Sequence, residues 1–320
     1  MTLLATVVLG MFALAAHTDT TLAVRPGSRL EVSNFGGAVA VSSWGKNAVR
    51  IEADHGSRTT VQIETIERGL RVATSGRRGP PGSVEFQITV PTWMSVVVTG
   101  PFSDVSVAGT RSDIRVETVK GDVHVEGGSG FISLSTVQGL VNLARSQGRI
   151  RLSSINDGVT ASDVKGQLRV ETVNGDVTLE RIDADAVDAN SVSGDLSFSG
   201  PLHNPGRYRL QTHSGEIRML LPDKPNADVA METYSGDFET DFDVHVDELQ
   251  GNKRFEFTLG TGGPLLDLQA FSGSIRLLRA TRVLEREGRT LEHVKERTKR
   301  LEKRTEKARI KHSQDSQEEK

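Results

Sequence analysis

Apolar residues recur at nine-residue intervals through the centre of the chain. Polar and apolar residues alternate around each of them, as where Val123 and Val125 flank His124. Alternation with a period of two places successive side chains on opposite faces of a β-strand. The pattern therefore predicts a series of short strands, each with one buried face. The recurring positions are Val105, Ile114, Val123, Ile132, Val141, Ile150, Val159, Leu168 and Val177, and Val187 and Leu196 continue them after one added residue.

Turn residues separate the predicted strands and repeat with a longer period. The segments TVKG, TVQG, TVNG and SVSG begin at residues 118, 136, 172 and 191. Their spacing indicates a unit of 18 residues that contains two strands. This unit explains why VETVKGDVHVEG at 116–127 returns as VETVNGDVTLER at 170–181, three units later.

Two all-β architectures fit this pattern. One is an antiparallel meander, for which Asn174-Gly175 is a favourable hairpin turn. The other is a parallel β-solenoid, similar to a β-helix, in which rungs of about 18 residues stack on one another. A meander tolerates strands of unequal length, whereas stacked rungs need a constant length. Nine successive apolar positions at one spacing therefore favour the solenoid.

The repeat assigns most of the chain to one scaffold. We expect an N-terminal β cap over residues 17–100 and the β-strand-repeat solenoid over 101–280. The later turns, in 212–217, 233–238 and 270–275, lie 21 and 37 residues apart, and prolines in the added residues indicate loops. The glycines to which we assign a structural role at the turns are Gly121, Gly139, Gly175, Gly194, Gly215, Gly236 and Gly273.

The first 16 residues have the composition of a signal peptide. An apolar run from Leu3 to Ala16 is shorter than the ~20 residues that a membrane span needs. Ala13 and Ala15 have the spacing of a cleavage site, which predicts processing after Ala15 and export to the periplasm or cell envelope. No basic residue precedes the run, and a buried first strand is the alternative.

The end of the chain has a different character from the repeats. Residues 282–320 contain 13 Lys and Arg against 9 Asp and Glu, and no strand-like alternation. A thin apolar stripe from Leu284 to Ala308 predicts a charged helix over 281–320. Such a tail can be solvated, can associate with itself or a partner, or can contact an anionic membrane surface.

Composition excludes several kinds of chemistry. The chain has no cysteine, so it has no disulfide, thiolate nucleophile or cysteine-bound zinc. Residues 1–281 contain 26 Lys and Arg against 33 Asp and Glu, which gives no basic footprint for nucleic acid. The eight histidines are scattered without a metal-ligand spacing, and no nucleotide-binding or nucleophile motif is present. We therefore expect no cofactor and no metal centre.

Acidic residues follow several of the turn glycines. The position after the glycine is Asp122, Leu140, Gly158, Asp176, Asp195, Glu216 and Asp237 along the repeats. Stacked carboxylates about 4.8 Å apart can bind Ca²⁺ or a cationic ligand, or form a pair for glycoside chemistry. An Asp beside a turn can instead bond to its own backbone. We take the turn role as the expectation and keep Asp176, Asp195, Glu216 and Asp237 as ligand or cation candidates.

A second column changes from aliphatic to aromatic. It consists of Val119, Val137, Ile155, Val173 and Val192, followed by His213, Tyr234 and Phe271. The aromatic members can form a platform for a sugar, or can fill the added volume of wider rungs. We expect the packing role.

The segments VRPGSRLEVSNFGGAVAVSSWGKNAVRIEA and ITVPTWMSVVV, with the TVxGDV turns, resemble the bacterial putative-adhesin family, a β-strand-repeat domain of unknown function. The resemblance covers about residues 20–280 and implies an exported or envelope-associated protein, without catalytic residues. We therefore expect a non-catalytic envelope or adhesion module that contacts an envelope protein or polysaccharide. The alternatives are a β-helix enzyme acting on polysaccharide and a polymer-forming scaffold of the bactofilin kind.

Overall fold

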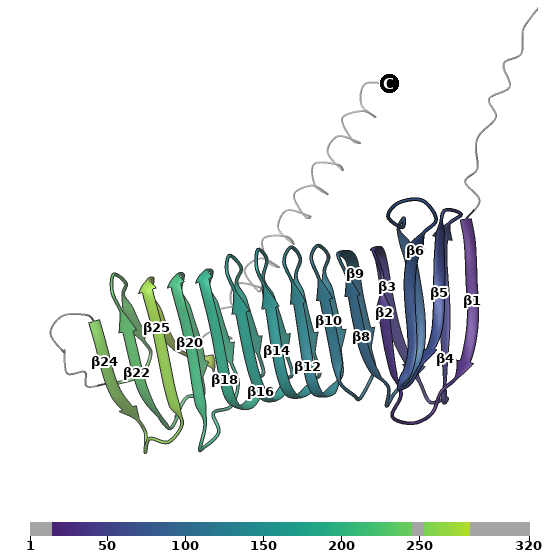
Figure 1. Ribbon diagram of the computed structural model, residues 1–320. Helices are drawn as coiled ribbons and strands as arrows, with labels where there is room; N and C mark the ends of the chain where they lie inside the picture. The colour runs from purple at the N-terminus through teal and green to yellow at the C-terminus, as the bar shows by residue number, and fades with distance from the viewer. Residues whose placement is uncertain (1–14, 245–252, 282–320) are drawn as a thin grey trace, which may run out of the picture.

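The computed structural model describes residues 15–244 and 253–281 as an elongated stack of β-strands (Figure 1). The strands form two sheets of 13 strands each, and all neighbouring strands in the middle of both sheets are parallel. The predicted all-β class and the parallel solenoid are confirmed, and the antiparallel meander is wrong. With about 4.8 Å between neighbouring strands, the stack is roughly 60 Å long.

One strand of each rung lies in sheet A and the next in sheet B. In spatial order, sheet A consists of β1 (Ala15–Ala23), β4 (Ala48–Gly56), β7 (Val84–Pro91), β3 (Gly36–Trp44), β9 (Phe102–Ala108), β11 (Val123–Glu126), β13 (Val141–Ala144), β15 (Val159–Ser162), β17 (Val177–Glu180), β19 (Leu196–Ser199), β21 (Ile217–Leu221), β26 (Ile275–Arg279) and β23 (Phe238–Thr240). Sheet B consists of β24 (Lys253–Leu259), β22 (Ala227–Thr233), β25 (Leu265–Ser272), β20 (Arg207–Ser214), β18 (Asp183–Ser193), β16 (Lys165–Thr172), β14 (Gln147–Ser154), β12 (Ser129–Thr136), β10 (Ile114–Thr118), β8 (Ser95–Gly100), β2 (Arg29–Ser33), β6 (Gly69–Gly76) and β5 (Thr59–Ile66).

The register places equivalent residues of successive rungs side by side. Ile114 pairs with Ile132 in sheet B, and Val123 pairs with Val141 in sheet A, in both cases 18 residues apart. These side chains are buried between the sheets. Burial of each such side chain stabilises the fold by about 1.5–3 kcal/mol. The nine-residue interval in the sequence is therefore the path from one sheet to the other.

The TVxG turns connect sheet B to sheet A at one corner of every rung. The first residue of the turn points inward, and its hydroxyl donates to a backbone carbonyl of the neighbouring rung, as from Thr136 to the Gly121 carbonyl at 3.1 Å. The glycine allows the turns to approach closely, because a Cβ on Gly139 would lie 2.1 Å from the same Gly121 carbonyl oxygen. The inward hydroxyls belong to Thr118, Thr136, Ser154, Thr172, Ser191, Thr212 and Thr233.

The residue added before Val187 forms an irregularity in β18. Gly166 pairs with Ala184, but Gln167 pairs with Ala186, so Asp185 is the extra residue on β18. A bulge of this kind leaves two residues opposite one. It keeps Val187 beside Leu168 in the core and places the small Ala186 between Gln167 and Arg207 on the outer face.

The last rung in the sequence is not the last rung in space. β25 pairs in parallel with β20 on one side and with β22 on the other (Figure 1). In sheet A, β26 likewise lies between β21 and β23. The three later turns therefore do not stack in chain order. The chain passes outward to β22, β23 and β24 and then returns to fill the position beside β20 and β21.

In the N-terminal region too, strands that are distant in the sequence are neighbours in the stack. β2 and β3 are parallel to β8 and β9, so residues 29–44 already form a rung of the stack. Antiparallel pairs, β1 with β4 and β5 with β6, cover this end. The division into a cap over 17–100 and a solenoid over 101–280 stays a prediction. Residues 1–14 of the signal-like segment and the tail beyond residue 281 lie outside the described residues.

Candidate functional site

The structure places the acidic candidates at the corner where the TVxG turns end, and the carboxylates of Asp176, Asp195 and Glu216 contact the next rung. An Asp176 carboxylate oxygen accepts a hydrogen bond from the Asp195 backbone N–H at 2.8 Å, and Asp195 accepts one from Glu216 in the same way. The Asp122 carboxylate likewise accepts a hydrogen bond from the Leu140 backbone N–H at 2.8 Å. These carboxylates therefore connect successive turns through backbone hydrogen bonds.

The four acidic candidates do not form an uninterrupted column. Because β26 lies between β21 and β23, Ser274 separates Glu216 from Asp237. The Glu216 carboxylate also has cationic neighbours, since Arg218 lies 2.7 Å and Arg276 3.2 Å from its oxygens. Asp176, Asp195 and Glu216 therefore lie on successive rungs, and Asp237 lies beyond Ser274.

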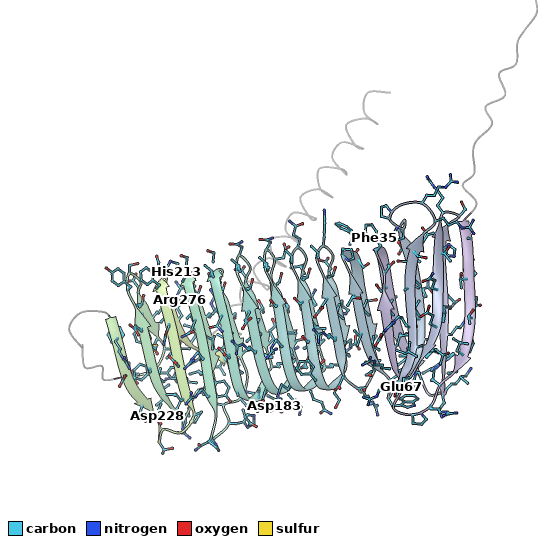
Figure 2. All side chains as sticks on the ribbon, in the orientation of Figure 1. Phe35, Glu67, Asp183, His213, Asp228 and Arg276 are labelled. Atoms are coloured by element: carbon cyan, nitrogen blue, oxygen red, sulfur yellow. The ribbon has the colours of Figure 1, made fainter. Side chains whose placement is uncertain are left out.

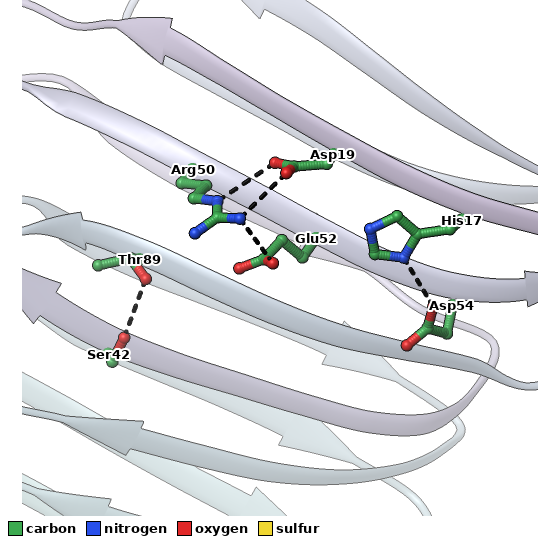
Figure 3. Close-up of polar contacts among 7 residues, drawn as sticks. All are labelled: His17, Asp19, Ser42, Arg50, Glu52, Asp54 and Thr89. Carbon is green, nitrogen blue, oxygen red and sulfur yellow. Dashed lines mark hydrogen bonds and ion pairs between the residues drawn. The ribbon is translucent and has the colours of Figure 1, made fainter.

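Within residues 15–244 and 253–281, the one cluster with metal-ligand geometry consists of His17, Asp19 and Glu52 (Figure 3). Arg50 bridges its two carboxylates, with distances of 3.0 Å to Asp19 and 2.9 Å to Glu52. The Arg50 hydrogen bond lowers the pKa of Asp19. A hydrogen bond to Asp54 at 2.8 Å raises the pKa of His17. A guanidinium between the carboxylates opposes a second cation, so this cluster is an ion-pair network that fastens β1 to β4.

The aliphatic and aromatic column forms an exposed ridge along the corner. We call Val119, Val137, Ile155, Val173, Val192, His213, Phe271 and Tyr234, in their spatial order, the corner ridge. Figure 2 shows Phe35 and His213 on this same long edge of the stack. Phe271 is 50% exposed and Tyr234 63% exposed. The expectation that the aromatic members pack inside wider rungs is therefore wrong.

The three rings at the end of the corner ridge stack on one another. The centroid of Phe271 lies 4.7 Å from that of His213 and 5.0 Å from that of Tyr234, with interplanar angles of 11° and 2°. Phe271 therefore has both faces covered and presents its edge to solvent. Tyr234, at one end of the stack, is more exposed than Phe271. The insertion of β25 between β20 and β22 brings the three rings together, although their spacing in the sequence is irregular.

A groove of about 400 Å³ lies beside these rings, on the outer face of sheet B. Amide side chains form its other wall. The Gln211 amide donates to Gln269 at 2.8 Å, and the Asn190 amide donates to Asp188 at 3.0 Å. Among the described residues, no donor bonds to the side-chain carbonyl oxygens of Asn190 and Gln211. The groove thus combines aromatic edges with free polar acceptors.

Farther along sheet B, a second hollow of about 360 Å³ is lined by a cluster of positively charged side chains. Five arginines and one acidic residue line it, namely Arg149, Arg151, Arg169, Arg207, Arg209 and Asp188. The composition does not reveal this group, because the chain as a whole is slightly acidic. The available signal was the 18-residue spacing of Arg151 and Arg169, which places them on neighbouring strands with the same orientation.

The described residues contain no helix that is long and apolar enough to cross a membrane. Among curated proteins, none matches the chain. The family model described as Toastrack DUF4097 matches residues 18–278.

Solved structures give distant similarities. A putative adhesin from Bacteroides fragilis is 14% identical, with 84% of this chain and 100% of that chain covered, at a TM-score of 0.37. A putative cell adhesion protein from Clostridium sporogenes is 12% identical, with 83% and 100% covered, at 0.25. A putative lipid binding protein from Parabacteroides distasonis is 11% identical, with 82% and 96% covered, at 0.35. At these scores the similarities carry no argument about function.

Proposed function

Because the chain belongs to the Toastrack DUF4097 family, we propose that it is a non-catalytic interaction module of the cell envelope that binds an extended glycan. The corner groove beside His213, Phe271 and Tyr234 supplies the binding site. The single observation that carries the proposal is the exposed stack of three rings beside a row of amides. Export to the periplasm or envelope belongs to the same proposal and follows from the apolar segment that ends near Ala15.

The groove has the chemical composition that sugar recognition needs. Sugars present C–H groups that contact aromatic surfaces and hydroxyls that bond to amides and carboxylates, and binding sites combine apolar walls with a few fixed polar groups. Asn190 and Gln211 offer acceptors on neighbouring strands, about 4.8 Å apart. The groove follows the stacking direction over several rungs, so a chain of sugars fits it better than a single ring does.

The scaffold favours binding by preorganisation. Turns and strands repeat their backbone hydrogen bonds from rung to rung, and the ring stack is held at both faces of Phe271. A surface that is already ordered loses little conformational entropy when a ligand binds. A regular solenoid with an aromatic groove is thus suited to holding a polymer, and no bound-state rearrangement is needed.

The test is binding to polysaccharide isolated from the envelope of the native host. We expect wild-type protein to bind, and Tyr234→Ala and Phe271→Ala to reduce the affinity at least about fivefold by removing ring surface. Phe102→Ala is the matched control, because Phe102 is a similarly exposed ring (53%) at the opposite end of the row of corners. Absence of wild-type binding, or an equal loss in Phe102→Ala, would contradict the proposed groove.

Export is tested separately by fractionation of the native host. The mature protein should be recovered from the periplasm or envelope and should lack its first ~15 residues by intact mass. Full-length protein in the cytoplasm would refute the export part and leave the glycan groove to the binding assay.

A further inference from the structure

The pairing register of neighbouring strands brings several arginine side chains together on the outer face of sheet B. Arg149 and Arg151 are two residues apart on β14, so both point outward. Arg169 pairs with Arg151 on the neighbouring strand, and Arg207 and Arg209 project from β20 in the same two columns. Between these strands, the bulge in β18 puts Ala186 where its neighbours have long side chains. The result is the hollow lined by the five arginines and Asp188.

The positive charge of this hollow is only partly balanced. Arg169 has Glu171 at 2.7 Å, and Arg209 has Asp267 at 3.0 Å. Over the described part of the chain, Arg149, Arg151 and Arg207 have no ion-pair partner. Like charges that share a hollow repel one another, and an anion that enters relieves the repulsion. Guanidinium groups also match the planar geometry of a carboxylate through paired hydrogen bonds.

The hollow adjoins the corner groove through two shared strands. Asp188 and Asn190 are two residues apart on β18, and Arg209 and Gln211 are two residues apart on β20. In each pair the first residue lines the hollow and the second lines the groove. A polymer lying along the groove therefore has a direct path across the same face to the arginines.

We infer that the glycan is an acidic polysaccharide whose uronate carboxylates bind Arg149, Arg151 and Arg207 over Ala186, an inference that rests on the proposed glycan-binding function. The rest of the face favours a slender chain over a broad anionic surface. Outside the hollow, outward arginines of sheet B are already paired with carboxylates, as Arg115 is with Glu117 and Arg254 with Glu256, so a membrane or nucleic acid laid flat on this face would meet little unpaired positive charge there. Carboxylates spaced along one chain can reach the three arginines in the hollow, while uncharged groups of the same chain face Glu232, which lines the corner groove.

The experiment compares two polymers with the same backbone, polygalacturonate and its fully methyl-esterified form. We expect wild-type protein to bind the acid at least about tenfold more tightly than the ester by calorimetry, and to lose this preference at high salt. Arg149→Gln, Arg151→Gln and Arg207→Gln should each weaken binding of the acid about fivefold and leave binding of the ester unchanged. Arg68→Gln removes the same charge from an exposed site near the other end and should behave as wild type.

Each other outcome has a distinct consequence. Equal affinity for acid and ester, or an equal loss in Arg68→Gln, would overturn the carboxylate site. Binding of phosphatidylglycerol vesicles that depends on the same three arginines, without uronate preference, would assign the hollow to a membrane. Release of unsaturated uronate, seen by ultraviolet absorbance, would make the protein a lyase, since Asp188 and arginine converge here. Binding of host polysaccharide that needs Tyr234 but none of these arginines would refute this inference and retain the proposed function.

Discussion

Replacing Gly139 with alanine tests the close stacking of the turns. Gly139 has a φ of +148°, a conformation that side-chain-bearing residues rarely adopt. A Cβ there would lie 2.1 Å from the Gly121 carbonyl oxygen, whereas ordinary contact begins near 3.4 Å. Relief requires the two turns to separate by about 1 Å, because both partners are backbone. That movement would break the 2.9 Å hydrogen bond from the Gly121 N–H to the Gln138 carbonyl.

The cost of this change follows from its two parts. Backbone strain at such a residue amounts to about 1–3 kcal/mol, and a lost hydrogen bond adds about 0.5–1.5 kcal/mol. We therefore expect Gly139→Ala to lower the free energy of unfolding by about 2–4 kcal/mol. This corresponds to a decrease in Tm of roughly 5–15 °C for a domain of this size.

The assay is thermal unfolding followed by circular dichroism, with Gly45→Ala as the control. Gly45 has an ordinary φ, and no heavy atom lies within 4 Å of a Cβ built on it. Its replacement should leave Tm unchanged or slightly raised, since alanine reduces the freedom of the unfolded chain. Equal melting of Gly139→Ala and Gly45→Ala would refute the reasoning about the turns.

Three further predictions address the inserted rung, the acidic corner and the first strand. Ser214 and Ser272 are paired across β20 and β25, so the double variant Ser214→Cys with Ser272→Cys should form a disulfide in this cysteine-free chain. The double variant Ser214→Cys with Ser235→Cys, whose positions are two rungs apart, should not. The reverse pattern on a non-reducing gel would show that the rungs stack in chain order. Asp195→Asn keeps a side-chain acceptor for the Glu216 N–H, so its Tm should match that of wild type, and millimolar Ca²⁺ should change the Tm of neither protein. A calcium-dependent rise in the Tm of wild type that Asp195→Asn abolishes would make the corner a metal site. The hydrogen bond to Asp54 raises the pKa of His17 in the folded state, so the stability that His17 gives β1 is complete below about pH 6.5 and is lost as the pH rises through the raised pKa. Protection of the β1 amides from hydrogen exchange should therefore fall over that range in wild type but not in His17→Gln. Identical pH profiles for the two proteins would contradict this prediction.

Local periodicity was sufficient to predict the fold class and the parallel stacking. The alternation around Val123 fixed which side chains face inward, and the 18-residue unit fixed which residues are neighbours on adjacent strands. The one added residue before Val187 was visible in the sequence, and the structure shows it as the bulge in β18. These features depend on contacts between residues at a constant separation, which a single sequence displays directly.

Features that depend on non-sequential contacts could not be predicted in this way. The turn spacings of 21 and 37 residues are compatible with any order of the last rungs, so the sequence did not indicate that Phe271 lies between His213 and Tyr234. The same insertion separates Glu216 from Asp237. The arginine hollow needs both the register of β14, β16 and β20 and the gap at Ala186, and the near-neutral composition conceals it.

We propose that the outer face of sheet B, from the arginine hollow to the ring stack, binds one acidic glycan chain. Oxidative footprinting with and without polygalacturonate measures this surface directly. Bound polymer should protect Phe131, which lines the hollow, together with Phe271 and Tyr234, and should leave Phe102, which is 53% exposed and lines neither site, unchanged. Protection of Phe102 to the same extent, or no protection of Phe131, Phe271 and Tyr234 at saturating polymer, would show that the glycan does not bind this face.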